Sequence, residues 1–186
     1  MTLAEEHDGL FTSKQARQSG IADSVLARLT QRGRLERTAR GVYRIPYIPL
    51  NRFSQYREAA LWAQAHSGPD SVALSHETAL AVYGISDANP AAIHLTIPKS
   101  ARLRRESPKA VVIHRKEIAD HEVAVVEGVP VTSIARTIND LLQSGGRFDL
   151  IGQAITDARR EGYISVSEAR QLRTVVKRHL EGLRAS

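Results

Sequence analysis

The sequence has no cysteine, one methionine and one tryptophan, and aromatic residues make up only 5% of its 186 residues. The lack of cysteine excludes disulfide frameworks, thiolate zinc sites and cysteine nucleophiles. No apolar run approaches the roughly eighteen residues that a membrane-spanning helix needs. The first nine residues, MTLAEEHDG, are acidic and do not have the pattern of a signal peptide. We therefore expect a cytoplasmic protein with no membrane partner.

Basic residues outnumber acidic residues, but this excess is unevenly distributed along the chain. The 26 Lys and Arg residues outnumber the 20 Asp and Glu residues, which gives a net charge of +6. Residues 9–52 carry nine basic and two acidic residues, a net of +7, and residues 99–116 carry a net of +6. The rest of the chain is therefore net acidic. Two basic segments of this kind favour a polyanionic partner such as nucleic acid.

The first basic segment has the pattern of a helix-turn-helix. Thr12 or Ser13 can cap a short helix, and Gly20 can take the left-handed conformation that ends it. A second helix is expected over residues 23–32, capped by its first or second residue, Asp23 or Ser24, and ended by a glycine. The tight turn between the two helices is typical of a helix-turn-helix.

A β-hairpin is expected directly after the second helix. Residues 35–37 and 42–45 alternate apolar and polar side chains on either side of the turn Thr38-Ala39-Arg40-Gly41. Helix, turn, helix and hairpin within about 35 residues form the pattern of a winged helix-turn-helix. We assign this DNA-binding domain to residues 1–50.

Double-stranded DNA is the partner that such a domain would bind. Its second helix lies in the major groove, where Arg pairs with guanine and Gln with adenine. The outward residues expected there are Ser24, Arg28, Gln31 and Arg32. The hairpin residues expected to contact phosphate or the minor groove are Arg37, Thr38 and Arg40. The alternative is a solvated basic face with no ligand.

Three motifs in this segment occur together in a known family. They are Gly9-Leu10-Phe11-Thr12, the helix Ser24–Arg32 followed by Gly33, and Arg40-Gly41-Val42-Tyr43-Arg44. Because it contains these three motifs, the segment resembles the N-terminal domain of AbiEi-type antitoxins. These proteins are the antitoxin component of type IV toxin–antitoxin systems.

Residues 51–186 predict a larger domain of mixed helices and strands. Helices are expected over 53–66, 76–83, 134–143, 150–161 and 167–181, and strands over 93–97, 110–114, 123–126 and 129–132. Helices, then strands, then helices indicate the α+β class. The whole chain is thus expected to be α+β, with a winged helix-turn-helix followed by a larger domain that has a small sheet and C-terminal helices.

The resemblance continues into this larger domain and covers about residues 9–160. The motifs are LSHETALAVYGI, IHLTIP, VVIHR and VEGVPVTSIARTINDLL. They place ten residues at matching positions: His76, His94, Pro98, His114, Gly128, Pro130, Thr132, Ala135, Arg136 and Thr137. Some relatives carry an endonuclease-like C-terminal domain instead, which this sequence does not resemble.

The resemblance implies a function in abortive infection. The first domain would bind inverted repeats in the promoter of its own operon and repress it, and the second would assist promoter binding. The second domain would also counteract a separately encoded nucleotidyltransferase-like toxin, with or without stable contact between the two proteins. Because no self-pairing coiled coil is evident, we expect a monomer in solution that fills two half-sites cooperatively.

No pattern in the sequence favours catalysis, a cofactor or a metal site. His76-Glu77 begins an HExxH motif, but position 80 is Leu, so that motif fails. The seven histidines lack the i,i+3 or i,i+4 spacing of paired ligands, and a structural or surface role is expected for His94 and His114. A restriction-type nuclease needs a carboxylate followed by Glu- or Asp-x-Lys, and neither Asp140 nor Glu127 has such a Lys nearby in sequence.

The second basic segment is expected to be a loop between two strands. Its candidate phosphate contacts are Lys99, Arg102, Arg104 and Arg105. Each phosphate that they neutralise would steepen the salt dependence of DNA binding by about one unit on a log–log plot. The alternative is an ordinary solvated loop.

Three functions remain open from the sequence. The first is an autorepressing antitoxin, and the second is a winged-helix transcriptional regulator whose larger domain senses a ligand, with no toxin partner. The third is a nucleic-acid-processing enzyme that the winged helix delivers to its substrate. The first is preferred because the basic segment and the family motifs coincide.

Overall fold

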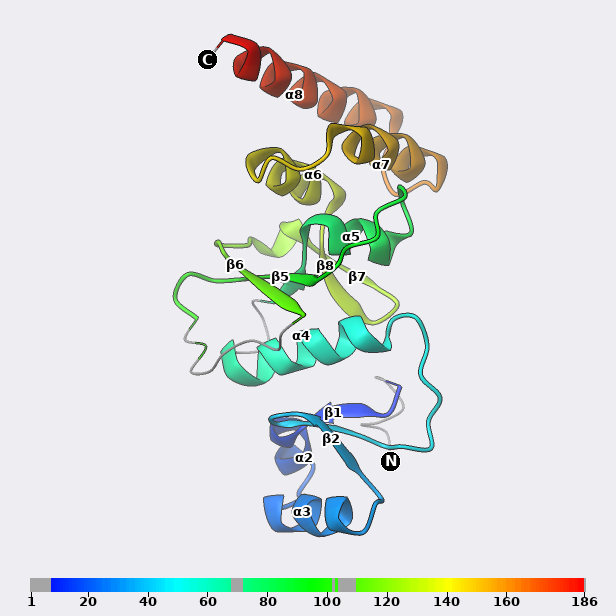
Figure 1. Cartoon of the computed structure of the whole chain (residues 1–186), viewed down its shortest axis with the longest axis vertical. Helices are drawn as coiled ribbons and strands as arrows, with labels where there is room; N and C mark the ends of the chain where they lie inside the picture. The colour runs from blue at the N-terminus through cyan, green and yellow to red at the C-terminus, as the bar shows by residue number, and fades with distance from the viewer. Residues whose placement is uncertain (1–7, 68–71, 102, 104–109, 186) are drawn as a thin grey trace.

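The computed structural model describes residues 8–67, 72–101, 103 and 110–185. Their helices and strands are stacked along the longest axis of the molecule, from α3 at one end to α8 at the other (Figure 1). The described residues form α-helices and two β-sheets, which confirms the predicted α+β class. None of their helices is both long and apolar enough to cross a membrane.

The N-terminal part contains the predicted pair of helices and the predicted hairpin. Helix α2 (Ser13–Gln18) and helix α3 (Asp23–Gln31) are followed by strands β2 (Glu36–Ala39) and β3 (Val42–Arg44). A strand that the sequence did not predict, β1 (Leu10–Thr12), precedes them. It pairs antiparallel with β3, so the sheet order is β1-β3-β2. We refer to these elements as the N-terminal lobe.

The two helices of the lobe begin in different ways. Thr12 caps α2 as predicted: its Oγ1 accepts a hydrogen bond from Gln15 N (3.1 Å), and Gln15 Oε1 accepts one from Thr12 N (2.7 Å). The predicted cap of α3 by Asp23 or Ser24 is wrong, because its N-cap is Ala22. Asp23 lies inside the first turn and pairs with Arg17 of α2 at 2.9 Å.

The hairpin is short and contains a bulge. Its register shifts between Arg37 and Ala39, which leaves Thr38 as the additional residue of the bulge. Gly41 has a φ of +77°, and its carbonyl oxygen accepts a hydrogen bond from Ser13 N at 2.9 Å. The turn of the hairpin therefore lies against the start of α2 rather than projecting from the lobe.

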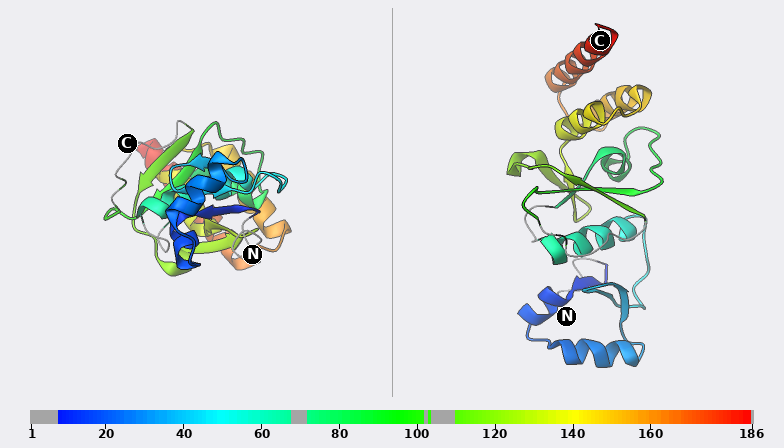
Figure 2. Two further views of the ribbon diagram at one scale, coloured as in Figure 1. Left: turned by 90° about the horizontal axis from the view of Figure 1, so that it is seen from below. Right: turned by 60° about the vertical axis from the view of Figure 1, so that its left-hand side comes forward.

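Helix α4 (Ser54–Ser67) lies between the N-terminal sheet and a second, five-stranded sheet (Figures 1 and 2). It contacts β1 and β3 on one side, and β5 (Ile93–Ile97) and β8 (Val129–Thr132) on the other. One hydrophobic cluster accordingly includes Leu10 and Val42 of the lobe together with Trp62 of α4 and Leu95 of β5. The division at residues 50 and 51 stays a prediction, but the two parts share this core.

A buried arginine on α4 connects three segments that are distant in sequence. The Arg57 side chain is only 7% exposed and forms an ion pair with Asp8, which precedes β1. Its Nη2 also donates a hydrogen bond to the carbonyl oxygen of Glu127 at 2.6 Å. Glu127 lies in the turn between β7 (Val123–Val126) and β8. Asn51 Nδ2 donates a hydrogen bond to the same Asp8 carboxylate.

The five-stranded sheet is mixed and has helices on both faces. Its order is β6-β5-β4-β8-β7, where β4 is Ala73–Leu74 and β6 is Val111–Arg115. The β5/β6 and β4/β8 pairs are parallel, and the other two are antiparallel. Helix α4 covers one face, and α5 (His76–Tyr83) packs against β5 and β8 on the other.

The C-terminal helices form a further layer. Helix α6 (Ile134–Gln143) packs on α5, and α7 (Phe148–Arg160) and α8 (Val166–Ala185) pack on α6 and on each other (Figure 1). A short 3₁₀ helix, η2 (Asp120–Glu122), precedes β7. The predicted bounds of α5 and α6 are confirmed, whereas the two-residue strand β4 was not predicted.

Replacing Arg57 is expected to destabilise the whole chain. The variant Arg57→Ala should lower the free energy of unfolding by about 2 kcal/mol, below the ~3–5 kcal/mol of a fully buried pair because Asp8 is 31% exposed. Urea unfolding followed by circular dichroism measures this change.

A matched control is Arg147→Ala, which breaks the ion pair with Asp149, whose side chains are 67% and 63% exposed. It should cost much less stability than Arg57→Ala, because water screens an exposed ion pair. Equal costs for the two variants would contradict the connecting role of Arg57.

Candidate functional site

The outer side of α3 presents the four residues that the sequence predicted to contact bases. Leu26 is buried on the inner side of the helix. The four residues on the other side are all exposed: Ser24, Arg28, Gln31 and Arg32. Their spacing of four, three and one residues keeps them on one helical face. Because α3 forms one end of the molecule, this face is open to a large ligand (Figure 2).

Ion pairing leaves this part of the lobe positively charged. The two acidic residues between positions 9 and 52 each neutralise one arginine: Asp23 pairs with Arg17, and Glu36 pairs with Arg44. Six exposed cations of the lobe make no ion pair among the described residues: Lys14, Arg28, Arg32, Arg34, Arg37 and Arg40. Lys14 and Arg34 were not among the predicted contacts, although the local charge excess includes them.

The hairpin residues differ from one another in accessibility. Arg37 and Arg40 are exposed, whereas Thr38 is half-buried. The hydroxyl oxygen of Thr38 is buried and has no hydrogen-bond partner in the described part of the chain. The bulge turns this side chain toward the protein, so in this conformation Thr38 does not present its hydroxyl to a phosphate.

Only part of the second basic segment is described. Arg102, Arg104 and Arg105 lie outside the described residues, so their predicted phosphate contacts stay predictions. Lys99 is exposed, and its backbone N donates a hydrogen bond to Glu117 Oε1 at 3.1 Å.

The end of this segment is held by acidic side chains. Lys116 Nζ lies 3.0 Å from Asp140 Oδ1, and Arg136 Nε lies 2.9 Å from Asp140 Oδ2. Asp140 is only 2% exposed, and Arg136 also pairs with Glu122. The fold thus brings a lysine to Asp140 from 24 positions earlier in the chain. A divalent metal, as in a nuclease, would have to displace both cations from this carboxylate.

Three histidines that are far apart in sequence meet on one side of the larger sheet. His76 begins α5, His94 lies on β5 and His114 lies on β6, and each offers a ring nitrogen within 4.8 Å of the others. The Nδ1 of His94 is 2.9 Å from the Nε2 of His114, and the His76 ring stacks on the His114 ring with centroids 3.7 Å apart. Strand alternation could have placed His94 and His114 on a common face, but the sequence did not show that their strands pair in parallel.

The surroundings of these rings favour their neutral form. Burial is the largest cause of a lowered pKa for all three, and the charge of His114 lowers the pKa of His76 further. His76 also has a φ of +55°, a left-handed conformation that costs a residue other than glycine about 1–3 kcal/mol. Strain of this kind is concentrated at functional sites.

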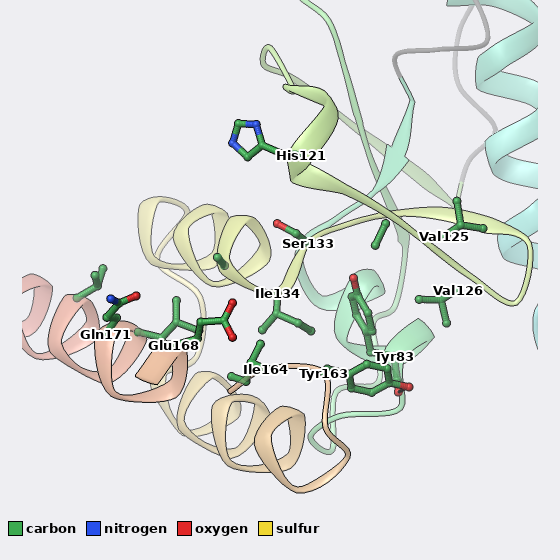
Figure 3. A pocket seen from close by; sticks show the side chains of 14 residues that line it. Tyr83, His121, Val125, Val126, Ser133, Ile134, Tyr163, Ile164, Glu168 and Gln171 are labelled. Carbon is green, nitrogen blue, oxygen red and sulfur yellow. Dashed lines mark hydrogen bonds between the residues drawn. The ribbon is translucent and has the colours of Figure 1, made fainter. Parts of the chain in front are cut away.

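A cavity of about 620 Å³ lies between β7, α6 and α8 (Figure 3). Its walls include Ile134, Val126 and Leu172. Tyr83 also lines it and donates a hydrogen bond to the carbonyl oxygen of Thr132 at 3.1 Å. Burial raises the pKa of the Tyr83 phenol to about 12. The volume lies within the range of about 300–1,000 Å³ that is common for small-molecule sites.

Comparison with known proteins gives a partial match in sequence and a wider one in fold. The family model described as "Transcriptional regulator, AbiEi antitoxin" matches residues 1–46. No curated protein matches the chain. The crystal structure of the RV2827C protein from Mycobacterium tuberculosis superposes with a TM-score of 0.54 at 15% identity, over 92% of this chain and 71% of that one. The superposition shows a shared fold, and residues 1–46 are similar to the AbiEi antitoxin family of transcriptional regulators.

Proposed function

We propose that this protein is a DNA-binding antitoxin of a type IV toxin–antitoxin system that represses its own operon. The observation that carries the proposal is a set of exposed cations on α3 and the hairpin that form no ion pair with any other described residue, within the segment that matches the family model. Cations without carboxylate partners are free to replace the counterions of DNA, and this exchange supplies much of the affinity of such proteins.

The residues of this interface take different roles in the proposal. The lobe acts as a winged helix-turn-helix, with α3 in the major groove of an inverted repeat in the promoter. Arg28 and Arg32 recognise guanine, and Gln31 recognises adenine. Arg37 and Arg40 contact phosphates and set the orientation of α3 on the duplex.

The larger part of the chain, residues 51–186, is proposed to counteract a nucleotidyltransferase-like toxin. We propose neutralisation with or without stable contact between the two proteins, and no catalytic step by this chain. The protein would be a cytoplasmic monomer that occupies two half-sites of its operator cooperatively.

A second candidate function is favoured by the cavity between β7, α6 and α8. In this alternative the protein is a transcriptional regulator that senses a small ligand there and has no toxin partner. Apolar walls and a few polar groups such as Glu168 and Gln171 are the usual composition of a ligand site. A nucleotidyltransferase gene beside this one favours the antitoxin, and its absence favours the regulator.

Removing single cations from the interface is expected to weaken DNA binding. Arg28→Ala and Arg40→Ala should each cost about 1–3 kcal/mol of binding free energy, and Arg40→Ala should reduce the salt slope by about one unit. Fluorescence anisotropy with labelled promoter DNA at several salt concentrations measures both quantities.

The matched control is Lys177→Ala. Lys177 is exposed on α8 and 3.8 Å from Glu181, at the opposite end of the molecule from α3. The variant Lys177→Ala should bind the promoter as tightly as the protein without substitutions. If neither Arg28→Ala nor Arg40→Ala weakened binding, the assignment of α3 and the hairpin would be wrong.

Repression and neutralisation can be separated with a full-length variant. Deleting the N-terminal lobe would uncover α4, because Leu10 and Val42 pack in the same core as Trp62. The double variant Arg28→Ala/Arg32→Ala removes only exposed side chains and should leave the fold intact. Co-expressed from a constitutive promoter with the neighbouring toxin gene, it should lose operator binding and still restore growth.

The unmodified protein and Lys177→Ala serve as positive controls for growth. Failure of the unmodified protein to restore growth in the presence of an expressed, active toxin would contradict the antitoxin function. Loss of rescue in the double variant alone would show that protection requires DNA binding.

A further inference from the structure

We propose that His76, His94 and His114 form a binding site for one divalent transition-metal ion, with Zn²⁺ the first choice. The ion would be held by three imidazole nitrogens and would keep its fourth position for water or another exchangeable ligand. This site is separate from the DNA interface, and the inference does not depend on the antitoxin function.

The nitrogens of the three rings are close enough together for one ion to bind them all. The offered nitrogens lie within 4.8 Å of one another, and His94 Nδ1 and His114 Nε2 are 2.9 Å apart. Nitrogens bound to one zinc ion at about 2.0–2.1 Å are about 3.4 Å apart when the coordination is tetrahedral. Binding therefore requires the nitrogens of His94 and His114 to separate, and it requires the His76 ring to tilt out of its stack on His114 so that its nitrogen points at the ion.

The type of donor defines the class of ion. Neutral imidazoles suit zinc, copper, nickel and cobalt, whereas magnesium and calcium require oxygen ligands. The nearby Asp140 carboxylate is bound to Lys116 and Arg136 and does not contribute oxygen atoms. The site is therefore a three-nitrogen site, and it should discriminate strongly against magnesium.

The groups behind His76 have the arrangement found around metal-bound histidines. Ser75 Oγ lies 2.9 Å from His76 Nδ1 and accepts a hydrogen bond from Thr96 Oγ1 at 2.8 Å. In the tautomer with a proton on Nδ1, His76 donates to Ser75 Oγ and leaves Nε2 free for a metal. Ligating histidines almost always have such a partner for their second nitrogen, and it fixes the orientation of the ring.

A purely hydrogen-bonded cluster explains less of this arrangement. The contact between His94 and His114 satisfies one nitrogen of each ring. It does not explain why His76 adopts a left-handed backbone conformation that places its ring against that of His114. A shared ion would bind all three rings, and it would connect the start of α5 to β5 and to the edge strand β6.

Metal titration of the full-length protein tests the proposal. After treatment with EDTA and gel filtration, the protein should bind one Zn²⁺ per chain by isothermal titration calorimetry, and its melting temperature should rise. Co²⁺ should bind with the same stoichiometry and give the intense visible absorption of tetrahedral coordination. Mg²⁺ should produce neither effect. Absence of one-to-one uptake of Zn²⁺ and Co²⁺ by the folded protein would overturn the proposal.

Variants assign the bound ion to these residues. His94→Gln and His114→Gln replace half-buried side chains and should each weaken Zn²⁺ binding by at least tenfold. Ser75→Ala should weaken it by about 10–100-fold, since it removes the partner of His76 Nδ1. His121→Gln is the matched control, because His121 is exposed on η2 and should not affect binding.

Circular dichroism establishes that each variant is folded before it is titrated. Unchanged Zn²⁺ affinity in folded His94→Gln and His114→Gln would place the ion elsewhere and overturn the assignment. If neither variant folds, the metal-free protein without substitutions is treated with diethyl pyrocarbonate, which modifies imidazoles, before Co²⁺ is added. Its Co²⁺ spectrum is then compared with that of untreated protein. Binding and absorption that resist this modification would also overturn it.

Discussion

Helix α4 is buried on both sides, one against β1 and β3 and the other against β5 and β8. A helix with apolar residues around most of its circumference is stable in water only when other elements cover it completely. Leu61, Trp62 and Ala63 are three consecutive residues with at most 4% exposure, so α4 requires both sheets. Arg57 adds a polar connection in the same place, since it binds Asp8 and the turn at Glu127. The position of α3 at one end of the molecule follows from this packing.

The distribution of charge becomes clearer when ion pairs are taken into account. The N-terminal lobe uses its two acidic residues to neutralise Arg17 and Arg44, and its other cations face solvent. In residues 51–186, Asp140 forms ion pairs with both Lys116 and Arg136, and this network is partly buried. The two basic segments of the sequence therefore differ physically. Within the described residues, the first segment leaves most of its cations exposed and without an ion pair, while the end of the second contributes to the fold.

Much of the fold could be predicted because its elements carry local patterns. The caps of α2 at Thr12 and of α6 at Ser133 are local hydrogen bonds, and α5 ends at Gly84, which takes the left-handed conformation. The exposed face of α3 follows from helical spacing alone. Strands β1 and β4 could not be predicted, because three and two residues are too few to show an alternation. Their extended conformation depends on hydrogen bonds with strands that are distant in sequence.

The sequence by itself determined the α+β fold class and the order of most of the helices and strands. It also identified the cations and glutamine of α3 as candidate DNA contacts. The tertiary structure decided how side chains outside α3 are oriented and which of them lie close together. A bulge in the hairpin turns Thr38 inward, and the pairing of β5 with β6 brings His94 and His114 to the start of α5. The physical reason is the range of the interactions involved. Helical periodicity and capping act between residues a few positions apart, whereas strand register and side-chain clusters depend on chain segments that meet only in the folded protein.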